Sequence, residues 1–168
     1  MVYSKLITLF LIVSAILLFE DVGICQPENI KTEIVKELNK IRQSGCKCGE
    51  EQMPPAGTLI WSEKLEQAAL RHVNDMFDHD HFDHTGTDGS DLGDRVDDTG
   101  YKWAMLGENI SCGYTTVEQV VQGWLDSEWH CRNLMNPVFR EVGAAKKGQY
   151  WALDLGRSKT IWEVSDSE

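Results

Sequence analysis

Positive charge is scarce in this chain. Lysine and arginine together number 16 against 27 aspartates and glutamates, which gives a formal net charge of −11. Phosphate backbones and anionic membrane surfaces repel such a protein, so nucleic acid is excluded as a partner. The sequence also lacks a basic run, a low-complexity tract, an internal repeat and a Pro/Gly-rich linker. A single ordinary domain is therefore expected.

A hydrophobic run long enough to cross a membrane is missing as well. The apolar run that follows Lys5 covers only Leu6–Phe19, about 14 residues, whereas a membrane span needs roughly 20. A charged start, a short apolar middle and small residues before a cleavage point are typical of a secretory signal. We therefore predict a signal peptide over 1–25 and a secreted protein, extracellular or periplasmic.

Cleavage after Cys25 leaves one predicted domain over 26–168, with its core at about 30–156. Two alternatives stay open for the N-terminal segment. One is a membrane anchor, which the short run disfavours. The other is acylation of Cys25 as a lipoprotein, which is less favoured because Ile24 is bulky where such sites carry a small residue.

Four cysteines follow the predicted cleavage point: Cys46, Cys48, Cys112 and Cys131. An even number in an exported chain indicates two disulfides, with three possible connectivities. Cys46 and Cys48 are poor partners for each other, so each is expected to pair forward with Cys112 or Cys131. A bridge that closes about 80 residues would stabilise the fold by roughly 4–5 kcal/mol. Cysteine ligation of zinc is the weaker alternative, because Cys-x-Cys lacks the usual two-residue spacing.

Apolar periodicity predicts helices over 28–43, after Ser62 and after Thr116, because apolar residues recur there at steps of three and four behind capping residues. A long loop with at most one helical turn is expected over 78–100, which is rich in Asp, Gly, His and Thr. Predicted strands are Glu108–Cys112, Glu141–Ala145 and Tyr150–Leu155. Helices before and between late strands favour an α/β layer structure.

One short motif matches a known metal signature. His79-Asp80-His81-Phe82-Asp83-His84 fits the His-x-His-x-Asp-His pattern that metallo-β-lactamases place at the end of a strand. Here the motif follows an amphipathic helix, and only His130 lies downstream to complete a second metal site. That fold is therefore disfavoured, and adventitious metal binding by the loop is the alternative that remains.

A longer series of motifs runs through the chain in order. It comprises Phe82-x-His84-Thr85, Asp88-Gly89-Ser90, Asp94-Arg95-Val96, Gly100-Tyr101, Gly107-Glu108-Asn109-Ile110, Gly123-Trp124-Leu125-x-Ser127-x-x-His130-Cys131-x-Asn133-x-Met135-Asn136-Pro137, Glu141-Val142-Gly143, Tyr150-Trp151 and Gly156. This series resembles the bacterial branch of the CAP superfamily, or SCP-like proteins. Relatives include cysteine-rich secretory proteins, venom allergens and pathogenesis-related class 1 proteins. The resemblance covers about Ile30 to Gly156.

The resemblance implies a three-layer α-β-α sandwich with a small central sheet and a cleft lined by His and Glu. It identifies His84 and Glu108 as cleft residues and His130 as part of a Trp-x-x-Ser-x-x-His element. It also implies that Cys48 pairs with Cys131. Cys46 and Cys112 would then remain as a second bridge.

Two positions depart from the animal and plant members. Ser127 stands where they carry a second glutamate, and Tyr150 stands where they carry a late histidine. The cleft or ligand candidates are therefore His84, Glu108, Ser127, His130 and Tyr150.

Three roles are open for His84, Glu108 and His130: a structural polar cluster, a three-ligand Zn²⁺ site with an open position, or an acid/base pair. Zinc is the one candidate cofactor. Ser127 and His130 are three residues apart, but no nucleophile elbow accompanies them, so no catalytic nucleophile is assigned. Arg95 is expected to pair with an acidic neighbour in the Asp-rich loop.

The function expected from these features is binding through the cleft, with a small hydrophobic ligand or an extracellular protein as partner. The alternative is a metal-assisted or His/Glu hydrolase that acts on peptide or cell-wall material. Whether the protein is an enzyme stays open at this point.

Overall fold

The computed structural model describes residues 28–160, so the predicted signal peptide and Cys25 lie outside the described residues. The elements of this part are α1 (Glu28–Ser44), β1 (Cys46–Cys48), β2 (Glu51–Met53), β3 (Ile60–Trp61), α2 (Glu63–His79), α3 (Leu92–Asp98), β4 (Trp103–Cys112), α4 (Val117–Asp126), α5 (Glu128–Met135), β5 (Glu141–Lys147) and β6 (Tyr150–Ser158). None of the helices within 28–160 is long and apolar enough to cross a membrane.

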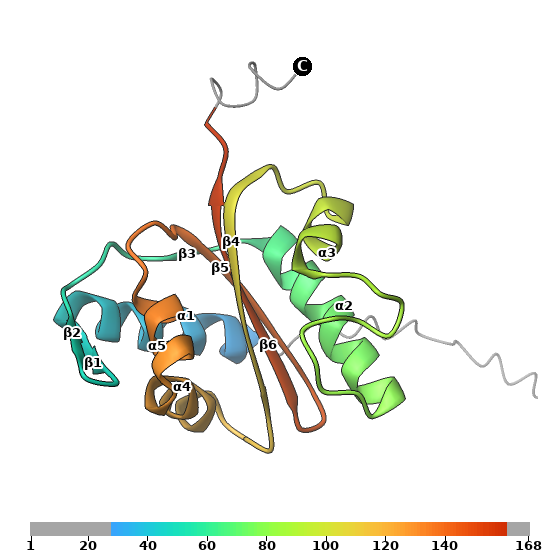
Figure 1. Ribbon diagram of the computed structural model, residues 1–168, viewed down its shortest axis with the longest axis horizontal. Helices are drawn as coiled ribbons and strands as arrows, with labels where there is room; N and C mark the ends of the chain where they lie inside the picture. Colours follow the sequence, from blue (N-terminus) through green and yellow to red (C-terminus); the bar gives the residue numbers. More distant parts are fainter. Residues whose placement is uncertain (1–27, 161–168) are drawn as a thin grey trace, which may run out of the picture.

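A four-stranded sheet in the order β3-β5-β6-β4 forms the middle layer (Figure 1). Strand β3 runs parallel to β5, and the other pairs are antiparallel. Helices α2 and α3 cover one face of the sheet, while α1, α4 and α5 lie on the other side. The predicted α-β-α sandwich is therefore confirmed, and β4 lies at one edge of its sheet.

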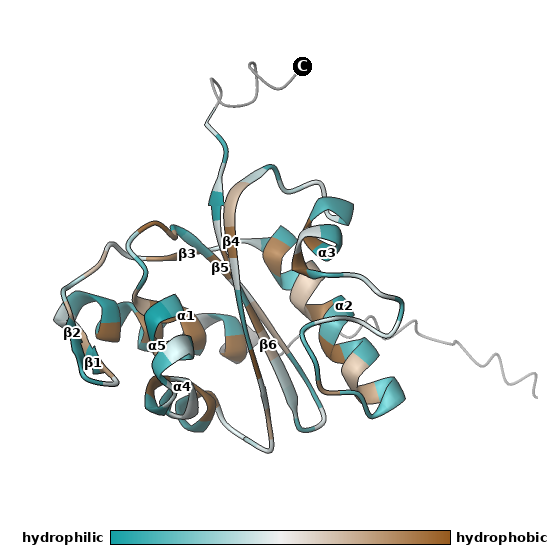
Figure 2. Ribbon diagram, viewed as in Figure 1, coloured by the Kyte–Doolittle hydropathy of each residue, from teal (hydrophilic) through white to brown (hydrophobic). Residues whose placement is uncertain are grey.

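Strand β6 contributes side chains to both faces of the sheet, because successive side chains of a strand point to opposite faces. Trp151 and Leu153 pack into the larger core with α1 and α4, whereas Ala152 packs against the buried side of α2. The hydrophobic stripes of the helices are turned towards the sheet, as Figure 2 shows. Burial of these two apolar faces is the main source of stability expected for such a sandwich.

The helix predicted after Ser62 is confirmed as α2. The Ser62 hydroxyl accepts a hydrogen bond from the backbone N–H of Leu65, which satisfies one of the free donors at the helix start. The helix predicted after Thr116 is confirmed as α4, with a capping box between Thr116 and Gln119. Within 78–100, where one helical turn is expected, α3 has 7 residues, or about two turns.

The β1–β2 hairpin and α5 were not predicted. Helix α5 follows α4 at once, and Ser127 between them makes no side-chain capping bond. Serine is a common N-cap residue, but with no break between the two helices Ser127 was not recognised as the start of α5. The polar hairpin has strands of only three residues each, too short for a clear alternation pattern.

The predicted bridge between Cys48 and Cys131 is confirmed, with a Cα–Cα distance of 5.5 Å. The second predicted bridge, Cys46–Cys112, is wrong, because both cysteines are free. Cys46 packs beside the disulfide near α5, whereas Cys112 packs with α2 residues on the other face of the sheet. The sheet itself therefore separates the two thiols.

Gly143 on β5 allows α2 to pack closely on the sheet. A Cβ atom at this position would overlap the backbone of Leu65 and Glu66. Backbone atoms of a capped helix cannot move aside as a flexible side chain can, so any side chain here must push α2 away.

We predict that Gly143→Ala lowers the free energy of unfolding by about 2 kcal/mol, because the added methyl overpacks the contact with α2. Urea denaturation measures this effect. Gly57→Ala is the matched control, because its Cβ would meet nothing closer than 3.9 Å. Equal stability of the two variants would contradict the close approach described here.

Candidate functional site

A buried carboxylate on the edge strand is the centre of the candidate site. Glu108 on β4 is only 8 % exposed and accepts two strong hydrogen bonds. His84 Nδ1 lies 2.6 Å from Glu108 Oε1, and Arg95 Nη2 lies 2.7 Å from Glu108 Oε2. One carboxylate therefore joins the sheet edge to the 80–91 loop and to α3.

Arg95 fixes the loop in place. Its side chain is fully buried on α3, and its guanidinium also donates to the backbone carbonyls of Ser90 and His84, at 3.0 and 3.1 Å. The prediction that Arg95 pairs with an acidic neighbour in the Asp-rich loop is wrong. Its ionic partner is Glu108, which the sheet places beside it, since a buried guanidinium needs a buried counter-charge.

The His84–Glu108 pair favours the charged forms of both groups. The hydrogen bond to Glu108 raises the pKa of His84 above its ordinary value of 6.5. Burial opposes ionisation of Glu108, but the bonds and charges of His84 and Arg95 outweigh it, so its pKa is lowered. The pair therefore favours the imidazolium form of His84. Its side chain is 57 % exposed, and with Nδ1 bound to Glu108, Nε2 is the ring nitrogen left for a ligand.

Two further buried polar residues lie behind this pair. His72 Nε2 on α2 is 3.9 Å from Glu108 Oε2, beyond hydrogen-bonding distance, and burial lowers the pKa of His72, which keeps the ring neutral. Asp154 on β6 is paired with Glu108 in the strand register. Burial, and then the charge of Glu108, raise the pKa of Asp154 well above its usual range, which favours its protonated form. Neither residue was among those predicted from the sequence.

Signals for both were present in the sequence. His72 falls on the same helical stripe as Ala69 and Val73, and Asp154 falls in the alternation that buries Ala152. A polar residue on a buried stripe is unusual, and such residues concentrate at functional sites.

His130 approaches from the opposite layer. Asn109 Nδ2 donates to the His130 carbonyl at 3.1 Å, and Asn133 Nδ2 donates to the Glu108 carbonyl at 3.2 Å, which ties α5 to β4. Burial, and then the charge of His84, lower the pKa of His130. The two histidines therefore come from opposite sides of the sheet edge, and their pKa values are shifted in opposite directions.

Ser127 and Tyr150 do not line the cavity at His84. Ser127 joins α4 to α5, and its carbonyl accepts a backbone hydrogen bond from Cys131. The Tyr150 hydroxyl donates to Asp80 at 2.8 Å. In the sheet Tyr150 is paired with Cys112, four residues from Glu108 and so about 13 Å along the strand.

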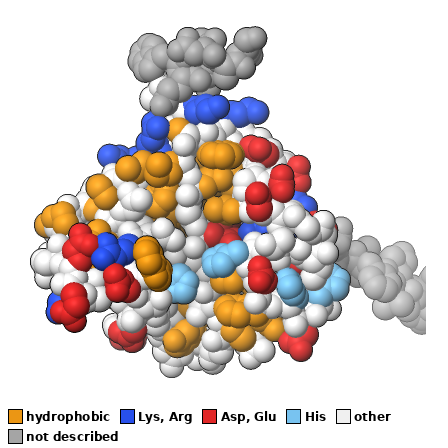
Figure 3. Space-filling model, in the orientation of Figure 1, with side chains coloured by type: hydrophobic (Ala, Val, Ile, Leu, Met, Phe, Trp, Pro, Cys, Tyr) orange, Lys and Arg blue, Asp and Glu red, His pale blue; other side chains and the backbone are white. Residues whose placement is uncertain are grey.

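A cavity of about 820 Å³ opens between His84 and β4. Its apolar wall is formed by Leu92, Trp103, Ala104, Met105 and Leu106, and its acidic rim by Asp91, Asp94 and Asp97. Figure 3 shows histidine side chains near the middle of this face, next to hydrophobic side chains and with acidic ones alongside. The cavity therefore has one polar end and one apolar wall.

The geometry does not assemble a three-ligand metal site from His84, Glu108 and His130. Both oxygens of Glu108 are engaged by His84 and Arg95. Within 28–160, the one group of three or more His, Cys, Asp or Glu ligand atoms that converge within 4.8 Å is Cys46, Cys48 and Cys131. The residues at the cleft therefore do not fit the predicted zinc ion in this arrangement.

The side chains of the His-x-His-x-Asp-His motif also make separate contacts and do not converge on one point. The His79 ring contacts Asp75, the His81 ring contacts the Thr85 carbonyl, and the Asp83 carboxylate accepts from the Thr85 backbone. Only His84 of this motif reaches the cavity.

Comparison with known proteins identifies the family. The model of the cysteine-rich secretory protein family, CAP, matches residues 35–151. The chain belongs to the CAP family. An uncharacterized protein of Bacillus subtilis, YkwD, is 34 % identical over 104 residues, which is 61 % of this chain and 40 % of the relative. The chain thus spans less than half the length of this curated relative.

Solved structures share the same fold. An extracellular protein of Bacillus anthracis that contains an SCP domain has a TM-score of 0.69 at 26 % identity, over 77 % of this chain and 41 % of its own. An outer surface protein of Borrelia burgdorferi has a TM-score of 0.67 at 17 % identity, over 79 % and 95 % of the two chains. Because its identity is only 17 %, the likeness to the Borrelia burgdorferi protein shows a shared fold and nothing more.

We predict that Glu108→Gln lowers the pKa of His84, because a neutral amide no longer stabilises the imidazolium. An NMR titration of the His84 ring measures the change. Glu66→Gln is the control, since the Glu66 carboxylate bonds Trp61 instead. An unchanged His84 pKa in a folded Glu108→Gln protein would contradict the assigned ion pair.

Proposed function

We propose that this CAP domain is an exported binding module that takes an uncharged amphiphile, such as a long-chain alcohol or a sterol, in the cleft beside β4. The observation that carries the proposal is the cavity that runs from His84 to Trp103 with a polar end and an apolar wall. Binding sites of small molecules usually combine an apolar lining with a few placed polar groups.

The apolar wall supports a hydrocarbon body. Met105 is 41 % exposed although it is a large hydrophobic residue, and it lies on the strand edge beside Trp103 and Leu106. Removing this apolar surface from water would contribute a favourable free energy of about 25 cal/mol per Å². At the other end, the Nε2–H of His84 supplies a donor for a hydroxyl or carbonyl oxygen.

The charges around the cavity favour an uncharged head group. The imidazolium form of His84, which its raised pKa favours, repels a cation at the polar end, while Asp91, Asp94 and Asp97 repel an anion at the rim. A neutral hydroxyl meets neither penalty and still accepts the hydrogen bond from His84. Together, His84 and the acidic rim favour neutral molecules among the hydrophobic candidates.

Export is part of the proposal. Support comes from the signal-like N-terminal sequence and from the Bacillus anthracis relative, which is described as an extracellular protein. The Cys48–Cys131 disulfide agrees with it, because such bonds persist in oxidising compartments.

A His/Glu hydrolase acting on peptide or cell-wall material is the second candidate. Its support is the 2.6 Å bond between His84 and Glu108, which orients the ring for acid/base work. Two features weigh against it. The raised pKa of His84 disfavours the neutral imidazole that a general base requires, and Thr85 is the one hydroxyl-bearing side chain in the cavity lining.

We expect a fluorescent long-chain alcohol to bind the protein, and Met105→Asp to weaken this binding at least about tenfold, because a carboxylate would replace apolar contact surface. A fluorescence titration measures the affinities. Met105 is exposed, so its substitution leaves the core intact.

Ile60→Asp is the matched control. Ile60 is also exposed and lines a second apolar groove with Val35, Leu59 and Trp61. Loss of binding in Ile60→Asp with normal binding in Met105→Asp would move the ligand to that groove. Cleavage of peptide or cell-wall substrates that is lost in His84→Ala would instead favour the hydrolase.

A further inference from the structure

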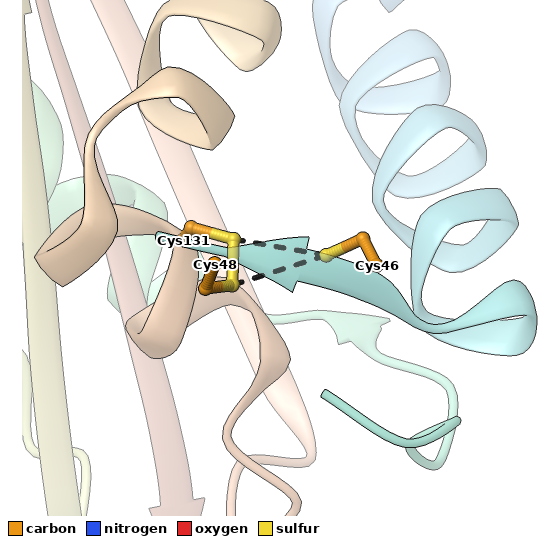
Figure 4. A group of neighbouring side chains, drawn as sticks. All are labelled: Cys46, Cys48 and Cys131. Carbon is orange, nitrogen blue, oxygen red and sulfur yellow. Dashed lines mark hydrogen bonds between the residues drawn. A yellow bond between two sulfur atoms is a disulfide. The ribbon is translucent and has the colours of Figure 1, made fainter. Parts of the chain in front are cut away.

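Three sulfur atoms from distant parts of the sequence meet between the β1–β2 hairpin and α5 (Figure 4). Cys46 and Cys48 are two residues apart on β1, so their side chains share one face of the hairpin. Cys131 comes from α5. Cys46 Sγ lies 3.6 Å from Cys131 Sγ and 3.9 Å from Cys48 Sγ.

We propose that these three cysteines form a thiolate site for a soft cation such as Zn²⁺ when the Cys48–Cys131 disulfide is reduced. In the disulfide form, the site has only the Cys46 thiol to offer. Reduction therefore opens the site and oxidation closes it. This inference is independent of what the cleft binds.

The spacing of the sulfur atoms agrees with tetrahedral ligation. A Zn–S bond of about 2.3 Å and tetrahedral angles place two ligating sulfurs about 3.8 Å apart. Both distances from Cys46 Sγ already have this value to within a few tenths of an ångström. Only Cys48 and Cys131 have to separate, and breaking their bond allows this.

The surroundings also suit a soft cation. Cys48 and Cys131 are fully buried and pack with Met135, while Cys46 is partly exposed. A cation can therefore reach the site from the Cys46 side, and solvent can occupy the fourth position. A set of three thiolates prefers Zn²⁺ or Cu⁺ over Ca²⁺ and Mg²⁺, which take oxygen ligands.

The reaction balances with an external dithiol as the reductant. The dithiol gives two electrons and two protons to the Cys48–Cys131 bond and itself becomes a disulfide. The protein then carries three thiols at this site. Binding of Zn²⁺ forms three Zn–S bonds and releases three protons to the solvent, which leaves a net charge of −1 on the complex.

Cobalt titration tests the proposal, because Co²⁺ bound to thiolates gives a near-ultraviolet charge-transfer band. The full protein is reduced with a dithiol, desalted without oxygen, checked for folding by circular dichroism and titrated with Co²⁺. We expect one Co²⁺ per reduced chain, displacement by Zn²⁺, and no band for the oxidised protein.

Cys46→Ser should lose the band, whereas Cys112→Ser should keep it. Cys112 is the matched control, because it is the other free cysteine within 28–160 and lies on the opposite face of the sheet. Cys46→Ser retains the disulfide, so its fold is verified in the oxidised state. A reduced wild-type protein without the band, a band kept in Cys46→Ser, or equal loss in both variants would overturn the proposal.

Discussion

A buried carboxylate must be paired to remain ionised, and this constraint on Glu108 organises one side of the molecule. Arg95 and His84 each take one oxygen of Glu108. Arg95 also holds the backbone carbonyls of Ser90 and His84, so the irregular segment before α3 is fixed over the sheet edge. This network forms the polar end of the cleft.

The other side of the sheet depends on a second buried cation. Arg42 on α1 is fully buried and donates to the carbonyls of Gly57, Leu134 and Phe139. These bonds tie α1 to the segment before β3, to the end of α5 and to the chain that follows α5, and so help to hold α5 in place. The helical layers on the two faces of the sheet are therefore each fixed by a buried guanidinium, Arg95 on the cleft side and Arg42 on the other.

Local signals in the sequence were sufficient for much of the fold. Ser62 and Thr116 cap helices whose apolar stripes are clear, so α2 and α4 could be predicted from a few residues each. Helix α5 was not predicted, because it begins directly after α4, with Ser127 as the one residue between them. The resemblance to the CAP family supplied the three-layer order and the Cys48–Cys131 pair, which local patterns left open.

The candidate site shows where sequence reasoning ends. His84 and Glu108 were proposed from motifs, and they lie in contact. The partner of Arg95 depends on how α3 packs on β4, and the positions of His72 and Asp154 depend on α2 and on the strand register. Cys46 and Cys112 looked like natural partners by count alone, yet opposite faces of the sheet keep them apart. The partners in these relations are set by tertiary packing, although the buried stripes that carry His72 and Asp154 can be recognised in the sequence.

If the cleft beside β4 is the binding site, two tryptophan indoles report binding there directly. Trp103 lines the cleft, and Trp61 lines the second apolar groove. The measurement is a ¹H–¹⁵N NMR titration with a long-chain alcohol, followed at the indole N–H signals of both residues. The account predicts a shift at Trp103 with Trp61 unchanged. A shift at Trp61 alone would contradict it.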